Sequence, residues 1–223
     1  MVRAISYRAG VLGALLWEAL SLAKTRAIEP VIRFVAVISR DPQVAGWARA
    51  KIAAAWGEIA ESTAPLLFTA NDYYRDEMGS GLTKTLLALA APADPAGLAD
   101  WKTETNAWEW LAASEFAGAT ARPLNLDPGY ITQAKLVLAT VKDRDHRVYL
   151  RDGIFGEITL SYVGGRWIDH RWTYPDYRGE TVFDFATRCR IRLRQHLRNT
   201  DGFRTAKKNS FLHDAPPPSP PST

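Results

Sequence analysis

Two glycine-containing turns constrain the fold of this chain more than any other feature of its sequence. Strand-like segments and turns alternate in the order His146–Leu150, Asp152-Gly153, Ile154–Tyr162, Gly164-Gly165 and Arg166–His170. Short connections of this kind join antiparallel neighbours, because glycine adopts the left-handed conformations that tight hairpins need. The sequence therefore predicts a three-stranded antiparallel meander between residues 146 and 170.

The residues before the meander alternate between strand-like and helix-like patterns. Val31–Ile38 is short, β-branched and almost continuously apolar, which is typical of a buried strand. Asp41 and Pro42 form a helix start, and Gly57 should end that helix. The elements that we predict next are strands at 62–69 and 82–90, a helix at 100–116, and a link at 117–130 with a turn at Asp127-Pro128-Gly129.

The segment from Ile131 to Val141 is ambiguous. Thr132 could cap a helix, yet Leu136–Thr140 could equally be a buried strand, and we favour the helix slightly. A final amphipathic helix is predicted at 181–199. Taken together, the pattern indicates an α+β fold: a mostly antiparallel sheet with a C-terminal β-meander and helices packed on one face.

The length and composition fit one domain with a sizeable core, since the chain has 223 residues of which 47% are hydrophobic. We expect residues 1–29 to be an N-terminal extension, either an amphipathic helix or the product of a start codon assigned too far upstream. Residues 30–200 should form a single globular α+β domain. Residues 201–223 hold five of the 13 prolines, which indicates a disordered tail. No apolar run reaches the roughly 18 residues of a membrane span, and we expect a cytoplasmic protein.

The basic charge is concentrated near the C-terminal end. Arg188–Lys208 holds eight basic residues and one acidic residue, whereas the rest of the chain holds 20 basic and 23 acidic residues. Such a segment could contact the phosphates of RNA. Charge runs alone carry little specificity, and the solvated side of a last helix is the simpler interpretation.

The sequence offers few metal ligands. A single cysteine and four dispersed histidines exclude the usual zinc sites. Asp72 and Asp76 would share one face of a helix and, with Glu77, could hold Mg²⁺. Alternatively, Asp72 caps a short helix that has acidic residues in its first turn, which is favourable for the helix dipole.

The geometry of the turn at Asp152-Gly153 decides which residue of the next strand lies opposite Arg147. A two-residue loop at Asp152-Gly153 would place Arg147 opposite Ile158, whereas a three-residue loop with a left-handed Gly153 would place Arg147 opposite Glu157. We favour the second, because opposite charges across strands stabilise the pair by about 0.2–1 kcal/mol. The resulting polar face could bind a small acidic ligand or could simply be solvated.

The segment Trp172–Arg178 holds three aromatic residues and a proline without periodicity. This composition is unusual for a solvent loop, and it predicts either a packing plug over the core or the wall of a pocket.

Several of these motifs also carry a family resemblance. They are Asp72-Tyr73-Tyr74-x-x-Glu77-Met78-Gly79, Asn125-Leu126-Asp127-Pro128-Gly129-Tyr130, Lys135-Leu136-Val137-Leu138-Ala139-Thr140, His146-Arg147-x-Tyr149-Leu150 and Trp172-Thr173-Tyr174-Pro175-Asp176-Tyr177-Arg178. Between about Pro30 and Arg198 the chain resembles a bacterial family of domains of unknown function, some of whose members are labelled GTP-binding proteins. The resemblance implies a cytosolic bacterial protein and supplies no activity.

The residues themselves do not support GTP as a cofactor. Gly79–Thr85 resembles a phosphate loop, but Thr83 stands where that pattern needs glycine directly before the lysine. The chain also lacks the Asn-Lys-x-Asp element that reads guanine.

Our leading hypothesis is a domain that binds or acts on a small anionic molecule, for example a phosphorylated one. The proposed catalytic residues are His146, Glu157 and Asp176, with Glu157 or Asp176 as general base. The proposed ligand-binding residues are Tyr73, Tyr74, Lys135, Arg147, Trp172, Tyr174 and Arg178. The alternative is a structural or interaction module, with RNA association through Arg188–Lys208.

Overall fold

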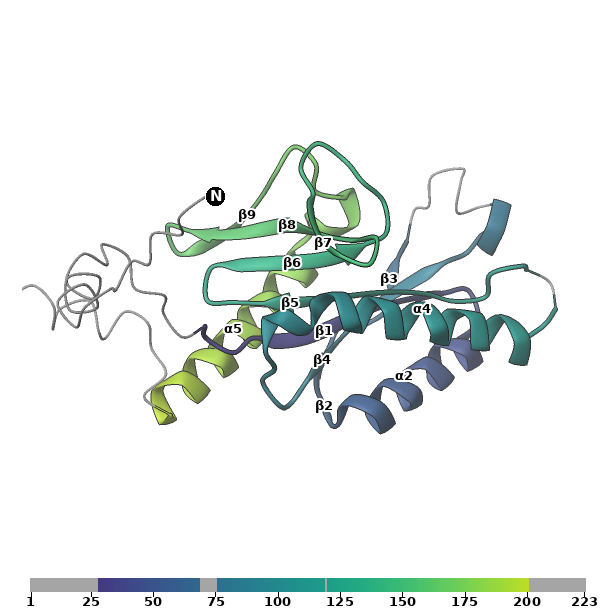
Figure 1. The fold of residues 1–223 in the computed structure, drawn as a ribbon, viewed down its shortest axis with the longest axis horizontal. Coiled ribbons are helices and arrows are strands. Elements are labelled where there is room, and N and C mark those ends of the chain that lie inside the picture. Colours follow the sequence, from purple (N-terminus) through teal and green to yellow (C-terminus); the bar gives the residue numbers. More distant parts are fainter. Residues whose placement is uncertain (1–27, 69–75, 119, 201–223) are drawn as a thin grey trace, which may run out of the picture.

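The computed structural model describes residues 28–68, 76–118 and 120–200 of the chain (Figure 1). The strands are β1 (Ile32–Ser39), β2 (Ile59–Ser62), β3 (Leu66–Leu67), β4 (Thr83–Leu89), β5 (Asn125–Ile131), β6 (Lys135–Thr140), β7 (Val148–Arg151), β8 (Ile154–Val163) and β9 (Arg166–Asp169). The helices are α2 (Pro42–Trp56), α4 (Leu98–Glu115) and α5 (Glu180–Asn199), with 3₁₀ turns η1 (Pro95–Gly97) and η2 (Pro175–Tyr177). None of the helices in the described ranges combines the length and apolar character needed to cross a bilayer.

All the strands belong to one antiparallel sheet within this described part. Its order is β2-β4-β1-β5-β6-β8-β7, with β3 also paired to β4 and β9 to β8. The meander predicted from the glycine turns is present as β7, β8 and β9. The predicted strand at 62–69 is replaced by the two short strands β2 and β3, which flank Pro65.

Helices cover both faces of this sheet. Val35 and Val37 of β1 pack in the cluster that contains α2 and α4 residues, whereas Phe34 and Ala36 pack in the cluster that contains α5. Successive side chains of a strand point to opposite faces, so α5 lies on the face opposite α2 and α4. The predicted α+β class and antiparallel sheet are confirmed, and the expectation of helices on one face is corrected by α5.

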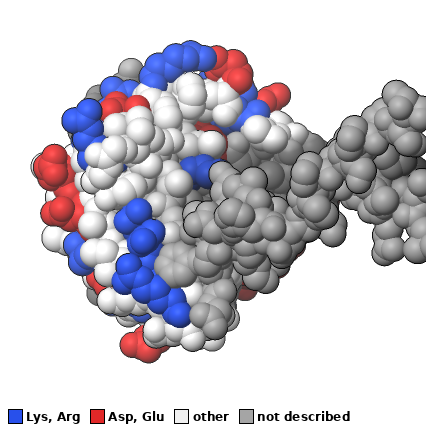
Figure 2. All heavy atoms as spheres, turned by 90° about the vertical axis from the view of Figure 1, so that its left-hand side faces the viewer, with Lys and Arg blue, Asp and Glu red and all other residues white. Residues whose placement is uncertain are grey.

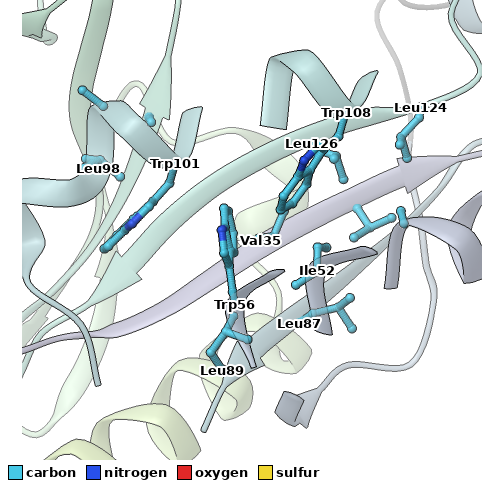
Figure 3. Packing of buried hydrophobic residues seen from close by; sticks show 14 of the residues in the cluster. Val35, Ile52, Trp56, Leu87, Leu89, Leu98, Trp101, Trp108, Leu124 and Leu126 are labelled. Carbon is cyan, nitrogen blue, oxygen red and sulfur yellow. The ribbon is translucent and has the colours of Figure 1, made fainter. Parts of the chain in front are cut away.

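Tryptophan packing builds the core between α2, α4 and the sheet. Figure 3 shows Trp56 of α2 and Trp108 of α4 pointing toward one another over Val35. Their ring centroids lie 5.0 Å apart with an interplanar angle of 45°. Burying such large rings supplies much of the apolar surface that fixes both helices on this face.

Helix α2 begins and ends where the sequence predicts. The side chain of Asp41 accepts a hydrogen bond of 2.8 Å from the backbone N–H of Gln43, and Gly57 ends the helix with a φ of 98°. A capping carboxylate satisfies one of the first orphan N–H groups, and glycine adopts the left-handed region at low cost. Helices α4 and α5 also confirm the predictions at 100–116 and 181–199.

The arginines of α5 hold that helix to the sheet. Arg188 forms a 2.9 Å ion pair with Glu61, and the Nε of Arg190 donates to the backbone carbonyl of Gln133 at 2.7 Å. Arg194 donates to the side-chain oxygen of Gln133 at 2.7 Å. Figure 2 shows Lys and Arg side chains gathered on the face where α5 ends. These three arginines are therefore already bound within the fold.

Two predictions between residues 117 and 141 are wrong. Pro128 and Gly129 lie within strand β5 instead of a turn, and residues 135–140 form strand β6 instead of a helix. The two errors have different physical causes. Pro128 and Gly129 are typical turn residues, and only their pairing with β1 explains why they lie in a strand. The cause at residues 135–140 is burial. A strand that is covered on both faces reads as a continuous apolar run, as Leu136–Ala139 does, and the alternation that marks a half-exposed strand is lost.

The turn between β7 and β8 differs from the predicted one, although the predicted partner is correct. Asp152 and Gly153 form a two-residue loop, both with left-handed φ values of 53° and 74°. An irregularity between Tyr149 and Arg151 shifts the register by one residue. Arg147 therefore still meets Glu157, with 2.8 Å between its Nε and Oε2 of the carboxylate.

Candidate functional site

Strands β5 and β6 are paired over only part of their length. Their ladder runs from Gly129 with Leu138 to Ile131 with Leu136. Residues 125–128 of β5 pair with β1 alone, and residues 139–140 of β6 pair with β8 alone. A cavity of about 770 Å³ is lined by both separated strand ends, by α4 from one face of the sheet and by η2 from the other.

Side chains of α4 replace the missing strand partner beside this opening. The backbone N–H of Leu126 donates to Oε1 of Glu109 at 2.8 Å, and its carbonyl accepts from Nζ of Lys102 at 2.7 Å. Alternate residues of a strand direct their N–H and C=O groups to the same neighbour, so Leu126 and Pro128 both face β6. Pro128 has no N–H to donate. The β5–β6 ladder therefore stops at Gly129, and side chains of α4 satisfy the N–H and C=O groups of Leu126 beside the opening.

A network of charged side chains, centred on the buried Lys102, surrounds the end of β5. Nζ of Lys102 lies 3.2 Å from Oδ1 of Asp127, and the side-chain amide of Asn125 donates to Oδ2 of Asp127 at 2.7 Å. Burial alone would raise the pKa of Asp127, but nearby Lys102 and Lys84 and the Asn125 hydrogen bond lower it below its usual value. Burial raises the pKa of Glu109, although Lys102 and Arg122 oppose the rise.

Arg122 joins this network to the residues that follow the undescribed segment 69–75. Its Nη2 donates to Oε2 of Glu109 at 2.8 Å, and its Nη1 lies 3.3 Å from Oε2 of Glu77. It also donates to the side-chain oxygen of Asn125. A single guanidinium therefore fixes three side chains of the cavity wall, using the several donors that its planar group presents.

Lys84 supplies a buried cation from the opposite face of the sheet. Its side chain is almost fully buried and forms an ion pair with Asp176. The ammonium lies 4.2 Å from the ring centroid of Tyr177 and 4.8 Å from that of Phe68. Carboxylate and aromatic faces together stabilise a charge that burial alone would disfavour.

Tyr177 has an unsatisfied hydroxyl. The side chain is buried and lines the cavity, and within the described ranges its hydroxyl has no hydrogen-bond partner. Burial raises the pKa of Tyr177 well above its ordinary value, and Asp176, Asp127 and Glu157 raise it further. The hydroxyl therefore keeps its proton and remains a hydrogen-bond donor at neutral pH.

Arg147 and Glu157 form another part of the cavity wall. Nη2 of Arg147 donates to the hydroxyl of Tyr174 at 2.9 Å. Oε2 of Glu157 accepts from Arg147, and Oε1 accepts from the hydroxyl of Thr159 at 3.2 Å. Nε2 of His146 lies 3.3 Å from Oε2 of Glu157. Both oxygens of this buried carboxylate are therefore occupied by neighbours.

A stack of three rings holds the segment before η2 against β8. Trp172 stacks with both His146 and His170, with centroid distances of 5.2 Å and 4.9 Å and nearly parallel rings. Its indole N–H donates to the carbonyl of Ile158 at 2.9 Å. The aromatic segment therefore acts both as packing, through Trp172, and as pocket wall, through Tyr174 and Tyr177.

The structure brings together some of the residues predicted from the sequence. Those lining the cavity are Glu77, Arg147, Glu157, Tyr174 and Asp176. His146 and Trp172 contact this wall without lining the cavity. Asp72, Tyr73 and Tyr74 lie outside the described residues, so their predicted roles remain predictions.

Other predicted residues lie apart from the cavity. Lys135 is exposed at the start of β6, whereas the cavity is lined by the opposite end of that strand. Arg178 binds the carbonyl of Thr173 at 3.0 Å and pairs with Asp169, so it stabilises its own loop. Asp76 follows the undescribed segment and does not line the cavity. In the described ranges, no three His, Cys, Asp or Glu side chains are grouped to hold a metal ion.

Sequence reasoning missed most of the charged network. The missed residues are Lys84, Lys102, Glu109, Arg122, Asn125, Asp127 and Tyr177. One available signal was the seven-residue spacing of Lys102 and Glu109, which places both on one side of a helix. Another was the alternation of Asn125 and Asp127, which share one face of a strand once that segment is recognised as β5.

Of the comparisons with known proteins, the one with family models finds a match. No curated protein sequence and no solved structure is significantly similar to this chain. The model of the family described as Domain of unknown function (DUF4416) matches residues 29–192, which is most of the chain. That range contains both separated strand ends, α4 and η2, so the whole cavity lies within the matched region. The resemblance seen in the sequence motifs is therefore confirmed, and the chain belongs to the DUF4416 family of domains of unknown function.

Proposed function

We propose that the cavity between β5 and β6 binds a small molecule that carries an oxyanion, such as a carboxylate or a phosphate. The observation that carries this proposal is the buried hydroxyl of Tyr177, which lacks a partner among the described residues. A buried polar group left unpaired costs about 1–3 kcal/mol. An acceptor oxygen of a ligand would accept a hydrogen bond from the hydroxyl and recover that cost.

The size and charge of the cavity support a ligand of this kind. A volume of about 770 Å³ lies within the range of pockets that hold small organic molecules. Five basic and five acidic side chains line it, so an anion entering the cavity meets no net negative charge. The basic side chains are Lys84, Lys102, Arg122, Lys142 and Arg147.

The carboxylates have a positioning role in this proposal. Glu157 contacts Arg147, and Asp176 contacts Lys84, so each fixes a cation at the cavity wall. Both were candidates for general base, and a base needs an oxygen that can reach the proton it removes. Because both oxygens of Glu157 are occupied, we assign it to holding Arg147 and Tyr174 in place, and we assign no reaction.

The RNA-associated alternative receives less support from the described residues. Arg188, Arg190 and Arg194 of α5 bind groups of the same chain, as the fold requires. Contacts to RNA phosphates would have to compete with these intramolecular bonds.

The experiment that tests the proposal compares the wild type with Tyr177→Phe, using ribose 5-phosphate as the probe in isothermal titration calorimetry. We expect the wild type to bind the probe and the variant to bind it about tenfold or more weakly, because a hydrogen bond to a charged group contributes about 1.5–3 kcal/mol. The thermal midpoint of the unliganded variant should match or exceed that of the wild type, since the hydroxyl lost has no partner to leave unpaired.

Tyr149→Phe is the matched control, because Tyr149 is an exposed tyrosine of β7 that does not line the cavity. It should bind ribose 5-phosphate as the wild type does. Equal affinities of the wild type and Tyr177→Phe for ribose 5-phosphate would show that this hydroxyl does not contact the ligand. Absence of binding to the wild type at millimolar concentrations would contradict the proposed function itself.

A further inference from the structure

An aromatic side chain that lines the cavity is largely exposed and contributes little to the packing of the core. Trp110 of α4 lines the cavity, yet 80% of its surface is exposed. The other two tryptophans of α4, Trp101 and Trp108, are buried in the core. Among the described residues, no aromatic ring or cation stacks on Trp110. A ring of this size left in solvent gives up the apolar burial that its two neighbours obtain.

The position of Trp110 follows from the helix. Asn106, Trp110 and Ala113 are spaced by four and three residues, so they share one side of α4, and all three line the cavity. Ala113 and Ala121, which also line it, are small. The short side chain of Ala113, one turn after the indole on the same side of α4, leaves room for a flat group next to it.

Asn106 adds a polar group one helical turn before the indole. Its side chain is half-buried at the cavity wall, and it makes no hydrogen bond with another described residue. An amide presents both donors and an acceptor in one plane. The edge of a heteroaromatic ring offers a matching planar arrangement of donors and acceptors.

We infer that Trp110 and Asn106 form a ring subsite, and that the ligand consists of a planar heteroaromatic ring joined to an oxyanion. The ring stacks on Trp110 while its edge meets Asn106, and the oxyanion reaches the Tyr177 end of the same cavity. This inference rests on the proposed function, because it adds a second subsite to the same cavity. Stacking between an aromatic side chain and a base tolerates many ring types, so the class of ligand is set by planarity and by the attached anion.

The test uses three matched probes in calorimetric titrations: AMP, ribose 5-phosphate and adenosine. AMP carries both groups, and each of the others lacks one of them. We expect the wild type to bind AMP about tenfold or more tightly than ribose 5-phosphate, because stacking on an aromatic side chain contributes on that order. Trp110→Ala should bind AMP as weakly as the wild type binds ribose 5-phosphate, while its own affinity for ribose 5-phosphate stays unchanged.

Leu111→Ala serves as the control, since Leu111 is the next exposed apolar residue of α4 and does not line the cavity. Asn106→Ala should weaken AMP binding and leave ribose 5-phosphate binding unchanged. Equal affinity of the wild type for AMP and ribose 5-phosphate would overturn the ring subsite and leave the oxyanion site standing. Failure of both phosphates to bind would overturn the proposed function and the ring subsite together.

Discussion

Replacing Lys102 with methionine is expected to lower the free energy of unfolding by about 3–5 kcal/mol at pH 7. The side chain of Lys102 is almost fully buried, and it contacts the carbonyl of Leu126 and the carboxylates of Asp127 and Glu109. Methionine keeps most of the volume but removes the charge and the donors. It leaves the partly buried carboxylates of Asp127 and Glu109 without one of their cations, and the carbonyl of Leu126 without this donor. Urea denaturation followed by circular dichroism measures the effect.

The matched control is Lys135→Met, at an exposed lysine of β6 outside the cavity. Its free energy of unfolding should lie within about 0.5 kcal/mol of the wild type, as is usual for surface substitutions. If Lys102→Met is no less stable than Lys135→Met, the contacts of Lys102 with Leu126 and Asp127 do not stabilise the end of β5.

The loss of stability in Lys102→Met should depend on pH. Lys102 lowers the pKa of Asp127 and opposes the rise in the pKa of Glu109, so removing it raises the pKa of both carboxyl groups. A carboxyl group whose folded pKa lies above its unfolded pKa loses stability as the pH rises through the folded value. The difference between wild type and variant should therefore be smaller at pH 5 than at pH 8.

The second large effect is expected at the point where β5 and β6 rejoin. Replacing Gly129 with alanine should lower the free energy of unfolding by about 3 kcal/mol, the upper end of the usual cost of overpacking. A Cβ at this position would lie 2.3 Å from the backbone oxygen of Val137 and 2.7 Å from the ring of Phe34. The backbone oxygen belongs to the neighbouring strand, so the clash can be relieved only by moving β6 away from β5.

Gly46→Ala provides the contrast within the same chain. Gly46 lies inside α2, and a Cβ there would meet nothing within 4 Å. Because glycine is a poor helix former, this variant should be more stable than the wild type by about 0.5–1 kcal/mol. A Gly129→Ala protein as stable as the wild type in urea would show that β5 and β6 do not approach as closely as the structure has them.

The parts of the fold that the sequence predicted are those with local signals. Asp41 and Gly57 mark the ends of α2, and the turn residues Asp152 and Gly153 mark the β7–β8 hairpin. Strands β5 and β6 were missed because their signals are not local. Pro128 and Gly129 are typical turn residues, and only the pairing with β1 on one side explains why they lie in a strand.

The candidate site was predicted only where its contacts follow a sheet register. Arg147 and Glu157 meet across the β7–β8 hairpin, and this pairing was predicted from opposite charge. The contact between Lys102 and the carbonyl of Leu126 joins a helix to a strand backbone 24 residues away, and no pattern of side chains encodes it. Tyr177 was not predicted, because the missing partner of a hydroxyl becomes visible only in three dimensions.

The central claim is that the opening between β5 and β6 is a ligand site, and NMR titration of the uniformly ¹⁵N-labelled wild type with AMP tests it most directly. We predict that the largest chemical-shift changes occur at the backbone amides of Leu126, Thr140 and Val141 and at the indole N–H of Trp110. The amides of α2, which does not line the cavity, should stay unchanged. Shifts confined to α2 or to the arginine-rich side of α5, with the Leu126 amide and the Trp110 indole unmoved, would contradict the account.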